Sequence, residues 1–138
     1  MNNSHKILII EDDRGIRRAL EFLLKKNGYR VFSAADGTNA IQIIFDEKPD
    51  LIILDLMIPE ISGFKIMQKI KENEKTCNAK IFIFTNLSDE KDKRMAKKLG
   101  ADGYFVKAEI SINEIIKKIN QVFETNVLLT NDKKENII

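Results

Sequence analysis

Residues 7–13 read Ile-Leu-Ile-Ile-Glu-Asp-Asp, so that four aliphatic residues run directly into three acids. An apolar run without polar alternation is typical of a strand that is buried on both faces, as in a parallel sheet. In open parallel sheets, ligands bind beyond the carboxyl ends of the strands. The stretch therefore predicts a central strand with a polar site at its end.

Short apolar runs of this kind recur along the chain. They lie at residues 7–10, 31–34, 51–54, 81–84 and 104–106. Between them the apolar residues fall at helical spacing, as in Ile16, Leu20 and Leu23. Alternating strands and helices predict an α/β fold: a doubly wound, flavodoxin-like (βα)₅ unit, whose five-stranded parallel sheet has the order 2-1-3-4-5 and helices on both faces.

The helical pattern fades after about Thr125. We therefore expect one domain at residues 1–125 and a short C-terminal tail at 126–138 that is poorly ordered. Before that point, residue types that are typical of helix ends mark where the expected helices begin and end. Ser111 and Glu114 form a capping box that opens the last helix, while Gly28 and Gly100 follow earlier helices. No second globular segment is recognised in the sequence, so we expect no attached output domain.

Composition excludes several classes of function. The chain has 138 residues, with 23 Lys and Arg against 21 Asp and Glu, and a net charge of +2, which argues against direct binding of nucleic acid. A single cysteine, Cys77, cannot form an internal disulfide bond, and no signal-peptide pattern opens the chain. No apolar run approaches the roughly 20 residues that span a membrane. We expect a soluble cytoplasmic protein that makes no membrane contact.

Acidic residues follow two strands that the predicted order makes neighbours. The first strand ends at Glu11 and Asp12, and the third ends at Asp55. Adjacent strands lie about 4.8 Å apart, so three carboxylates crowd one crevice and require a cation. An all-oxygen site with room for water suits Mg²⁺. The alternative is that each acid only caps a helix, as Asp13 is placed to do for the helix that begins near Arg14.

Polar residues also end the last two strands. Thr85 follows the fourth strand and Lys107 follows the fifth, so a hydroxyl and an ammonium group can bind an oxyanion on Asp55. Taken singly, a threonine in a strand and a solvated lysine are common. It is their joint placement opposite three acids that favours a functional site.

Four pieces of sequence together resemble the receiver domains of two-component response regulators. The resemblance covers about residues 5–124, and the four pieces follow one another along the chain in the order that the family has. The pieces are the run 7–13, residues 54–59 with Gly63, Thr85, and residues 100–107, which read Gly-Ala-Asp-Gly-Tyr-Phe-Val-Lys. Each piece alone is a weak signal, but the set is specific because every piece lies at a strand end.

The resemblance implies a phosphorelay function. Asp55 would accept a phosphoryl group from a sensor histidine kinase or a phosphotransfer protein. Mg²⁺ would be held by Asp12, Asp55 and the backbone carbonyl of Met57, with Glu11 acting through a bound water. Thr85 and Lys107 would hold the phosphoryl oxygens.

The resemblance also implies a switch, in which Thr85 and Tyr104 move together on phosphorylation. Their movement would reshape the face formed by the fourth helix, the fifth strand and the fifth helix, and so control a downstream protein partner. A homodimer remains open. The domain would not be a dedicated enzyme but would catalyse its own phosphorylation. Self-dephosphorylation is expected to be slow, because Met57 and Leu87 cannot orient a water molecule.

Two positions depart from the family pattern and leave alternatives open. Ala108 follows Lys107 where the family usually has a proline after a cis bond, and Asn86 stands where a small residue is usual. A degenerate receiver that only binds protein is therefore the main alternative. A flavin or nucleotide binder would need glycines after the first strand. An aspartyl phosphohydrolase would need an acid at Met57. The kinase, the target and the pathway are not identified by the sequence.

Overall fold

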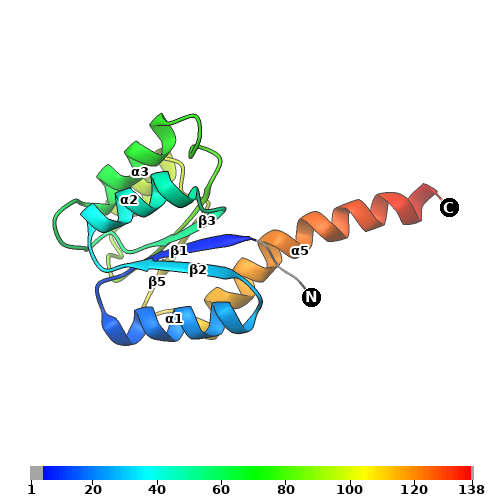
Figure 1. The fold of residues 1–138 in the computed structure, drawn as a ribbon, viewed down its shortest axis with the longest axis horizontal. Coiled ribbons are helices and arrows are strands. Elements are labelled where there is room, and N and C mark those ends of the chain that lie inside the picture. Colours follow the sequence, from blue (N-terminus) through cyan, green and yellow to red (C-terminus); the bar gives the residue numbers. More distant parts are fainter. Residues whose placement is uncertain (1–4, 138) are drawn as a thin grey trace.

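The computed structural model describes the backbone of residues 5–137 and the side chains of residues 5–124. Strands and helices alternate along the whole of this range (Figure 1). Among the described residues, no helix is both long enough and apolar enough to cross a membrane. The elements are β1 (Lys6–Ile10), α1 (Arg14–Lys26), β2 (Arg30–Ala34), α2 (Gly37–Glu47), β3 (Leu51–Leu54), α3 (Gly63–Glu72), β4 (Lys80–Thr85), α4 (Glu90–Lys98), β5 (Gly103–Val106) and α5 (Ile112–Ile137).

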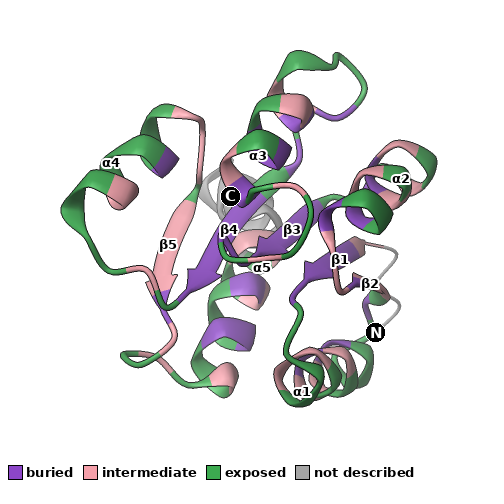
Figure 2. Cartoon of the chain, turned by 90° about the vertical axis from the view of Figure 1, so that its left-hand side faces the viewer, coloured by how far each residue is buried: buried purple, intermediate pink, exposed green. Residues whose placement is uncertain are grey.

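The five strands form one parallel sheet in the order β2-β1-β3-β4-β5, which confirms the predicted topology. Ile10 pairs with Leu54, Leu54 pairs with Ile83, and Thr85 pairs with Val106. Strands β1, β3, β4 and β5 therefore end close together at one edge of the sheet. Figure 2 faces this edge, and the residues that follow the four strands are brought together there.

Helices cover both faces of the sheet. Helices α2, α3 and α4 lie on one side and helices α1 and α5 lie on the other (Figures 1 and 2). Alternate residues of each strand point to opposite layers, as the pleat requires. Leu8 and Ile52 belong to the cluster on the α2–α3–α4 side, whereas Ile9 and Ile53 belong to the cluster on the α1–α5 side. Burial on both faces explains why the strands are continuous apolar runs.

Side-chain caps fix the starts of four helices. Asp13 accepts a hydrogen bond from the Ile16 amide, as expected, and Asp36 accepts one from the Asn39 amide. Ser62 caps α3 in the same way. The predicted capping box is present, with Ser111 and Glu114 exchanging hydrogen bonds between side chains and backbone amides. These caps anchor the short loops that follow the strands, and these loops carry the site.

The middle of α5 is held against the opposite end of the sheet. The Tyr29 hydroxyl donates to Asn120 Oδ1 at 2.6 Å, and the rings of His5 and Phe123 stack with centroids 4.0 Å apart. Side chains beyond Glu124 lie outside the described residues, as does all of residue 138. The expected tail at 126–138, and the division of the chain at residue 125, therefore stay predictions.

The layered core predicts unequal effects for two phenylalanines. Phe84 is 3% exposed between the sheet and α5, whereas Phe22 is 66% exposed on α1. Replacing a buried phenylalanine leaves a cavity, so Phe84→Ala should lower the free energy of unfolding by about 3–5 kcal/mol. Phe22→Ala should change it by less than about 0.5 kcal/mol. Urea denaturation measures both, and equal losses would contradict the assignment of the core.

Candidate functional site

Asp55 is the centre of the site, at the end of β3, and its residue is 4% exposed. Lys107 Nζ donates a hydrogen bond to Asp55 Oδ2 at 2.7 Å. The Thr85 hydroxyl and the Met57 amide both donate to Oδ1, at 2.7 and 3.0 Å. Both carboxylate oxygens are therefore oriented by charged or polar donors from three different elements of the chain.

Glu11 lies beside Asp55 and is 1% exposed. Its Oε1 lies 2.8 Å from Lys107 Nζ, and its Oε2 accepts a hydrogen bond of 3.0 Å from the Asp13 amide. The Lys107 ammonium group thus bridges the two buried carboxylates. It also lies 5.8 Å from the centre of the Phe84 ring, on whose face a cation is favourable.

Burial and hydrogen bonding at this edge shift the pKa values of Glu11 and Lys107. Burial raises the pKa of Glu11, and the hydrogen bonds from Lys107 and the Asp13 amide offset only part of that effect. Burial alone would lower the pKa of Lys107, but the hydrogen bonds to Asp55 and Glu11 outweigh it and raise the pKa. Lys107 is therefore held as a cation, and its charge is what makes two adjacent buried carboxylates tolerable.

Asp12 completes a cluster of three acids. Carboxylate oxygens of Glu11, Asp12 and Asp55 lie within 4.8 Å of one another. Glu11 and Asp55 are buried whereas Asp12 is exposed, so the cluster opens to water on one side. A donor set made only of oxygen atoms with space for water is the arrangement that Mg²⁺ prefers. The residues present therefore fit a divalent cation of that kind.

A chain of hydrogen bonds leads from Asp55 to the aromatic residue of β5. Thr85 Oγ1, which donates to Asp55, accepts from the Leu87 amide at 3.4 Å. The Leu87 carbonyl in turn accepts from the Tyr104 hydroxyl at 2.7 Å. Burial, and secondarily the charges of Asp92 and Asp55, raise the pKa of Tyr104 to about 12. Tyr104 is thus a neutral hydrogen-bond donor at physiological pH.

Ala108 and Asn86 depart from the family pattern, but neither disturbs the contacts of Asp55. Every described peptide bond is trans, including the bond between Lys107 and Ala108. The Lys107 side chain nevertheless reaches Asp55 and Glu11, as the distances above show. Asn86 is exposed. Neither position removes a group that contacts Asp55.

The structure brings together all the residues that the sequence singled out at the strand ends, and it adds contacts that the sequence did not reveal. Arg17 Nη1 donates to the backbone carbonyls of Glu11 at 2.9 Å and Asp12 at 3.3 Å. Leu87 links Thr85 to Tyr104 through its backbone. Backbone acceptors carry no mark in a sequence, so no signal pointed to these contacts.

Comparisons with known proteins agree with this geometry. A family model described as "Response regulator receiver domain" matches residues 7–120. The chain is 38% identical over 129 residues to "Probable transcriptional regulator ycf27" from Porphyridium aerugineum, an alignment that covers 89% of this chain. The alignment covers 52% of that relative, so the chain spans about half its length.

Two solved structures are similar over nearly the whole of their own chains. Chemotaxis protein CheY4 of Vibrio cholerae matches with a TM-score of 0.79 and 27% identity, covering 87% of this chain and 99% of that one. The signal receiver domain of the DNA binding response regulator merR from Colwellia psychrerythraea matches with a TM-score of 0.80 and 28% identity, covering 88% and 99%. The family match extends over most of the chain, and the strand order and acidic edge are those that the resemblance implied. The chain therefore belongs to the response regulator receiver domain family of two-component systems.

Proposed function

We propose that the domain accepts a phosphoryl group on Asp55 and that this new charge switches a protein-binding face. The observation that carries the proposal is the position of Lys107 Nζ, 2.7 Å from Asp55 and 2.8 Å from Glu11. A largely buried lysine between two buried acids adds little net stability, because removing these charges from water costs about as much free energy as their attraction returns. Such an arrangement is better explained by a reaction that changes the charge at Asp55.

The reaction is a substitution at phosphorus. A carboxylate oxygen of Asp55 attacks the phosphoryl group of a donor phosphohistidine, and a phosphorus–oxygen bond forms while the phosphorus–nitrogen bond breaks. The imidazole of the donor leaves with the electron pair. As the phosphoryl group arrives, Lys107 and the Thr85 hydroxyl move from the carboxylate to the phosphoryl oxygens, where they balance the negative charge.

Glu11, Asp12 and Asp55 are the side chains that would hold Mg²⁺, with the backbone carbonyl of Met57. The clustering of the three carboxylates supports this role. When bound, Mg²⁺ supplies positive charge to the phosphoryl oxygens. Glu11 is the most buried of the three acids and is already bonded to Lys107 and the Asp13 amide, which supports its expected contact through a water.

The switch would run through the hydrogen bonds from Thr85 to Tyr104. When Thr85 turns toward a phosphoryl oxygen, its bond to the Leu87 amide is lost, and the Leu87 carbonyl that holds Tyr104 shifts with the loop. The face between α4, β5 and α5 would then change its population of conformations. This coupling is favoured because each link between Asp55 and Tyr104 is a direct contact.

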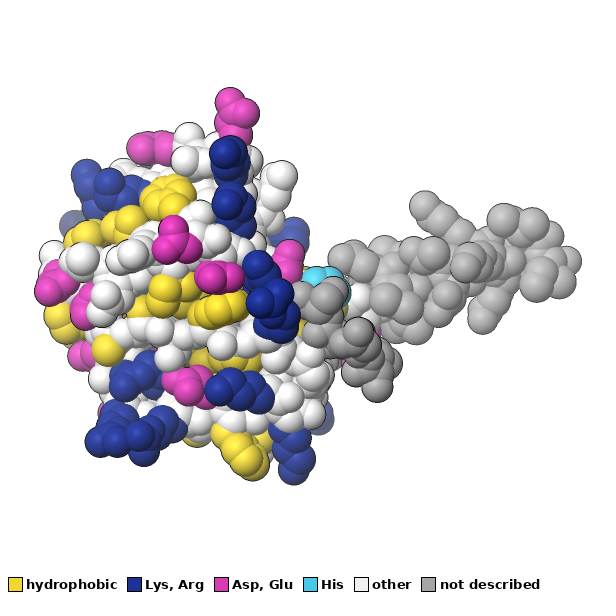
Figure 3. Space-filling view, in the orientation of Figure 1, with side chains coloured by type: hydrophobic (Ala, Val, Ile, Leu, Met, Phe, Trp, Pro, Cys, Tyr) yellow, Lys and Arg dark blue, Asp and Glu magenta, His cyan; other side chains and the backbone are white. Residues whose placement is uncertain are grey.

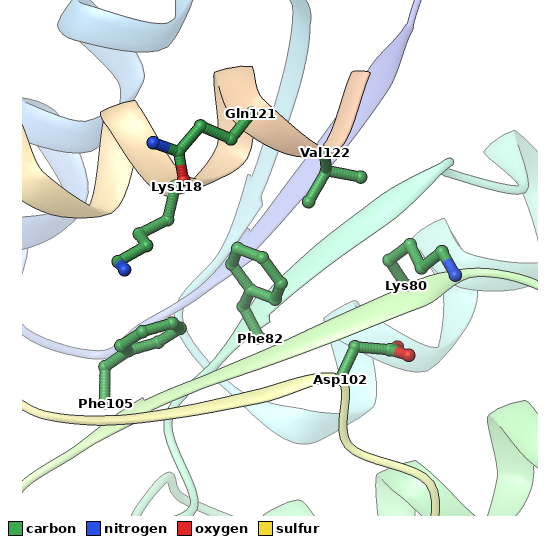
Figure 4. A pocket seen from close by; sticks show the side chains of 7 residues that line it. All are labelled: Lys80, Phe82, Asp102, Phe105, Lys118, Gln121 and Val122. Carbon is green, nitrogen blue, oxygen red and sulfur yellow. The ribbon is translucent and has the colours of Figure 1, made fainter. Parts of the chain in front are cut away.

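That face carries a hollow of about 530 Å³ beside β5. Phe82, Phe105 and Val122 supply its apolar walls, and Lys80 and Lys118 flank Phe82 on opposite sides (Figure 4). On the other side of β5, α4 exposes a set of basic residues around the exposed Met95. They are Lys91, Arg94, Lys97 and Lys98. An acidic partner segment with an apolar anchor side chain fits this combination of charge and shape.

Other expectations stay predictions. The identity of the kinase or phosphotransfer protein, a cytoplasmic location, the absence of direct nucleic-acid binding and the alternative of a homodimer all belong to this group. Because the chain spans about half the length of the curated relative that it matches, the activity of that whole protein is not transferred to it.

Phosphoryl acceptance can be measured by intact mass spectrometry after incubation with acetyl phosphate. We expect a gain of one phosphoryl group that requires Mg²⁺ and is absent in Asp55→Asn. Asp46→Asn, which changes an exposed aspartate on α2, is the matched control and should behave like the wild type. No gain in the wild type would instead support the alternative of a degenerate receiver that binds protein without phosphorylation.

The phosphorylated state should be long-lived, because the Met57 side chain is 56% exposed at the mouth of the site and cannot orient an attacking water. Met57→Asn supplies an amide that can do so, and it should shorten the lifetime of the phosphorylated protein several-fold. Loss of the phosphoryl mass with time measures this. Equally short lifetimes in the two proteins would refute the proposed slow self-dephosphorylation.

The partner face predicts selective binding of an acidic peptide. A synthetic peptide with glutamates on both sides of one phenylalanine should perturb the NMR signals of Phe82, Phe105 and Val122. Its binding should tighten when beryllofluoride mimics the phosphoryl group. Lys118→Glu should weaken binding several-fold, whereas Lys25→Glu on α1 should not. Equal weakening by both variants would indicate only a general attraction of charge.

A further inference from the structure

Glu60 has an unusual backbone conformation in the loop between β3 and α3. Its φ is +75°, in the left-handed region that glycine adopts freely and that costs energy for residues with a β-carbon. Among the described residues other than glycine, only Lys48 shares a positive φ. Such a conformation persists only where surrounding contacts maintain it. The contacts of Glu60 therefore indicate what this loop is built to do.

The contacts come from the first turn of α2. The Thr38 hydroxyl donates a hydrogen bond to Glu60 Oε2, and the Gly37 amide donates to the Pro59 carbonyl at 3.1 Å. Gly37 also packs directly against Ile61, since a β-carbon at Gly37 would lie 2.6 Å from the Ile61 β-carbon. The apex of the loop is thus fastened to α2 by one side-chain contact, one backbone contact and close packing.

The same loop carries Met57, whose backbone carbonyl is the expected ligand of the cation. Its base is tied to Asp55, because the Met57 amide donates to Asp55 Oδ1. The loop ends at Gly63, which packs closely against the backbone of Leu56, since a β-carbon at Gly63 would lie 2.7 Å from the Leu56 Cα. Between base and exit, Ile58 and Ile61 pack against the core cluster on the α2–α3–α4 side, and Pro59, Glu60 and Ile61 contact the start of α2. The contacts at the apex therefore contribute to how rigidly Met57 is presented.

We propose that Glu60 is a positioning residue whose bond to Thr38 holds the loop so that the Met57 carbonyl is placed for a divalent cation before the cation binds. This rests on the proposed Mg²⁺ site. Glu60 itself is exposed and its carboxylate is engaged by Thr38. It acts through the loop rather than as a ligand. A loop ordered in advance loses less conformational entropy on binding, and affinity rises accordingly.

The test measures the Kd of Mg²⁺ by calorimetry, with MgCl₂ alone and no phosphodonor. Thr38→Val removes the hydroxyl while keeping the shape, and it should weaken Mg²⁺ binding by roughly 3- to 10-fold, as expected for the loss of one hydrogen bond. Thr38→Ser keeps the donor and should retain wild-type affinity. Glu72→Gln, which removes an exposed charge from α3, is the control for a general electrostatic effect.

A double-mutant cycle distinguishes the effect of losing the Thr38–Glu60 hydrogen bond from the effect of general damage to α2. In a Glu60→Gly background, Thr38→Val should have no further effect on the Kd, because its partner is gone. Amide hydrogen exchange should quicken at Gly37 and Ile61 in Thr38→Val, but not at Lys48 at the far end of α2.

Each failure has a distinct meaning. An unchanged Kd in Thr38→Val, with Mg²⁺ binding intact in the wild type, would overturn the positioning role and leave the proposed function standing. The same would follow if Thr38→Val still weakened binding in the Glu60→Gly background. If the wild type bound no Mg²⁺, the cation site itself would be wrong and the inference would fall with it.

Discussion

The Lys107 ammonium group between Glu11 and Asp55 is the interaction on which the rest of the site depends. Two carboxylates buried side by side repel each other and lose their hydration, and a single cation within 2.8 Å of both offsets these costs. The sheet order makes this geometry available. Lys107 follows β5 and reaches across the end of β4, where Thr85 lies, to the acids that follow β1 and β3. Any charge added at Asp55 must redistribute these contacts.

Two routes lead outward from the same carboxylate. Through Thr85 and the backbone of Leu87, Asp55 is connected to Tyr104 and the face beside β5. Through the Met57 amide, it is connected to a loop whose apex is fastened to α2. The first route consists of hydrogen bonds alone, whereas the second adds close packing to its hydrogen bonds. Close packing on the side of the cation site suits the proposed function, in which the domain binds a cation and then changes shape. Figure 3 shows charged side chains of both signs interspersed on the face of the molecule that is turned to the viewer.

The sequence predicts the fold and the heart of the site for one physical reason. Parallel strands buried on both faces are continuous apolar runs, and their carboxyl ends meet at one edge of the sheet. The sequence therefore predicts that the residues at these ends lie close together, namely Glu11, Asp55, Thr85 and Lys107. The remaining contacts follow the paths of loops. Arg17 donates to backbone carbonyls and Leu87 acts through its own backbone, and no residue type reveals such partners. Glu60 occupies a left-handed position where glycine or asparagine would be the usual signal, and Thr38, its partner, lies 22 residues away in sequence. Such pairs can be identified only from coordinates.

The most direct measurement locates the phosphoryl group on the chain. Borohydride reduces an acyl phosphate to an alcohol, so a phosphorylated aspartate becomes homoserine, which tandem mass spectrometry identifies by position. After treatment with acetyl phosphate and Mg²⁺, we expect homoserine at position 55 alone. Homoserine at Asp12 or another acid, or at no position, would contradict the claim that the contacts of Lys107 and Thr85 make Asp55 the phosphoryl acceptor.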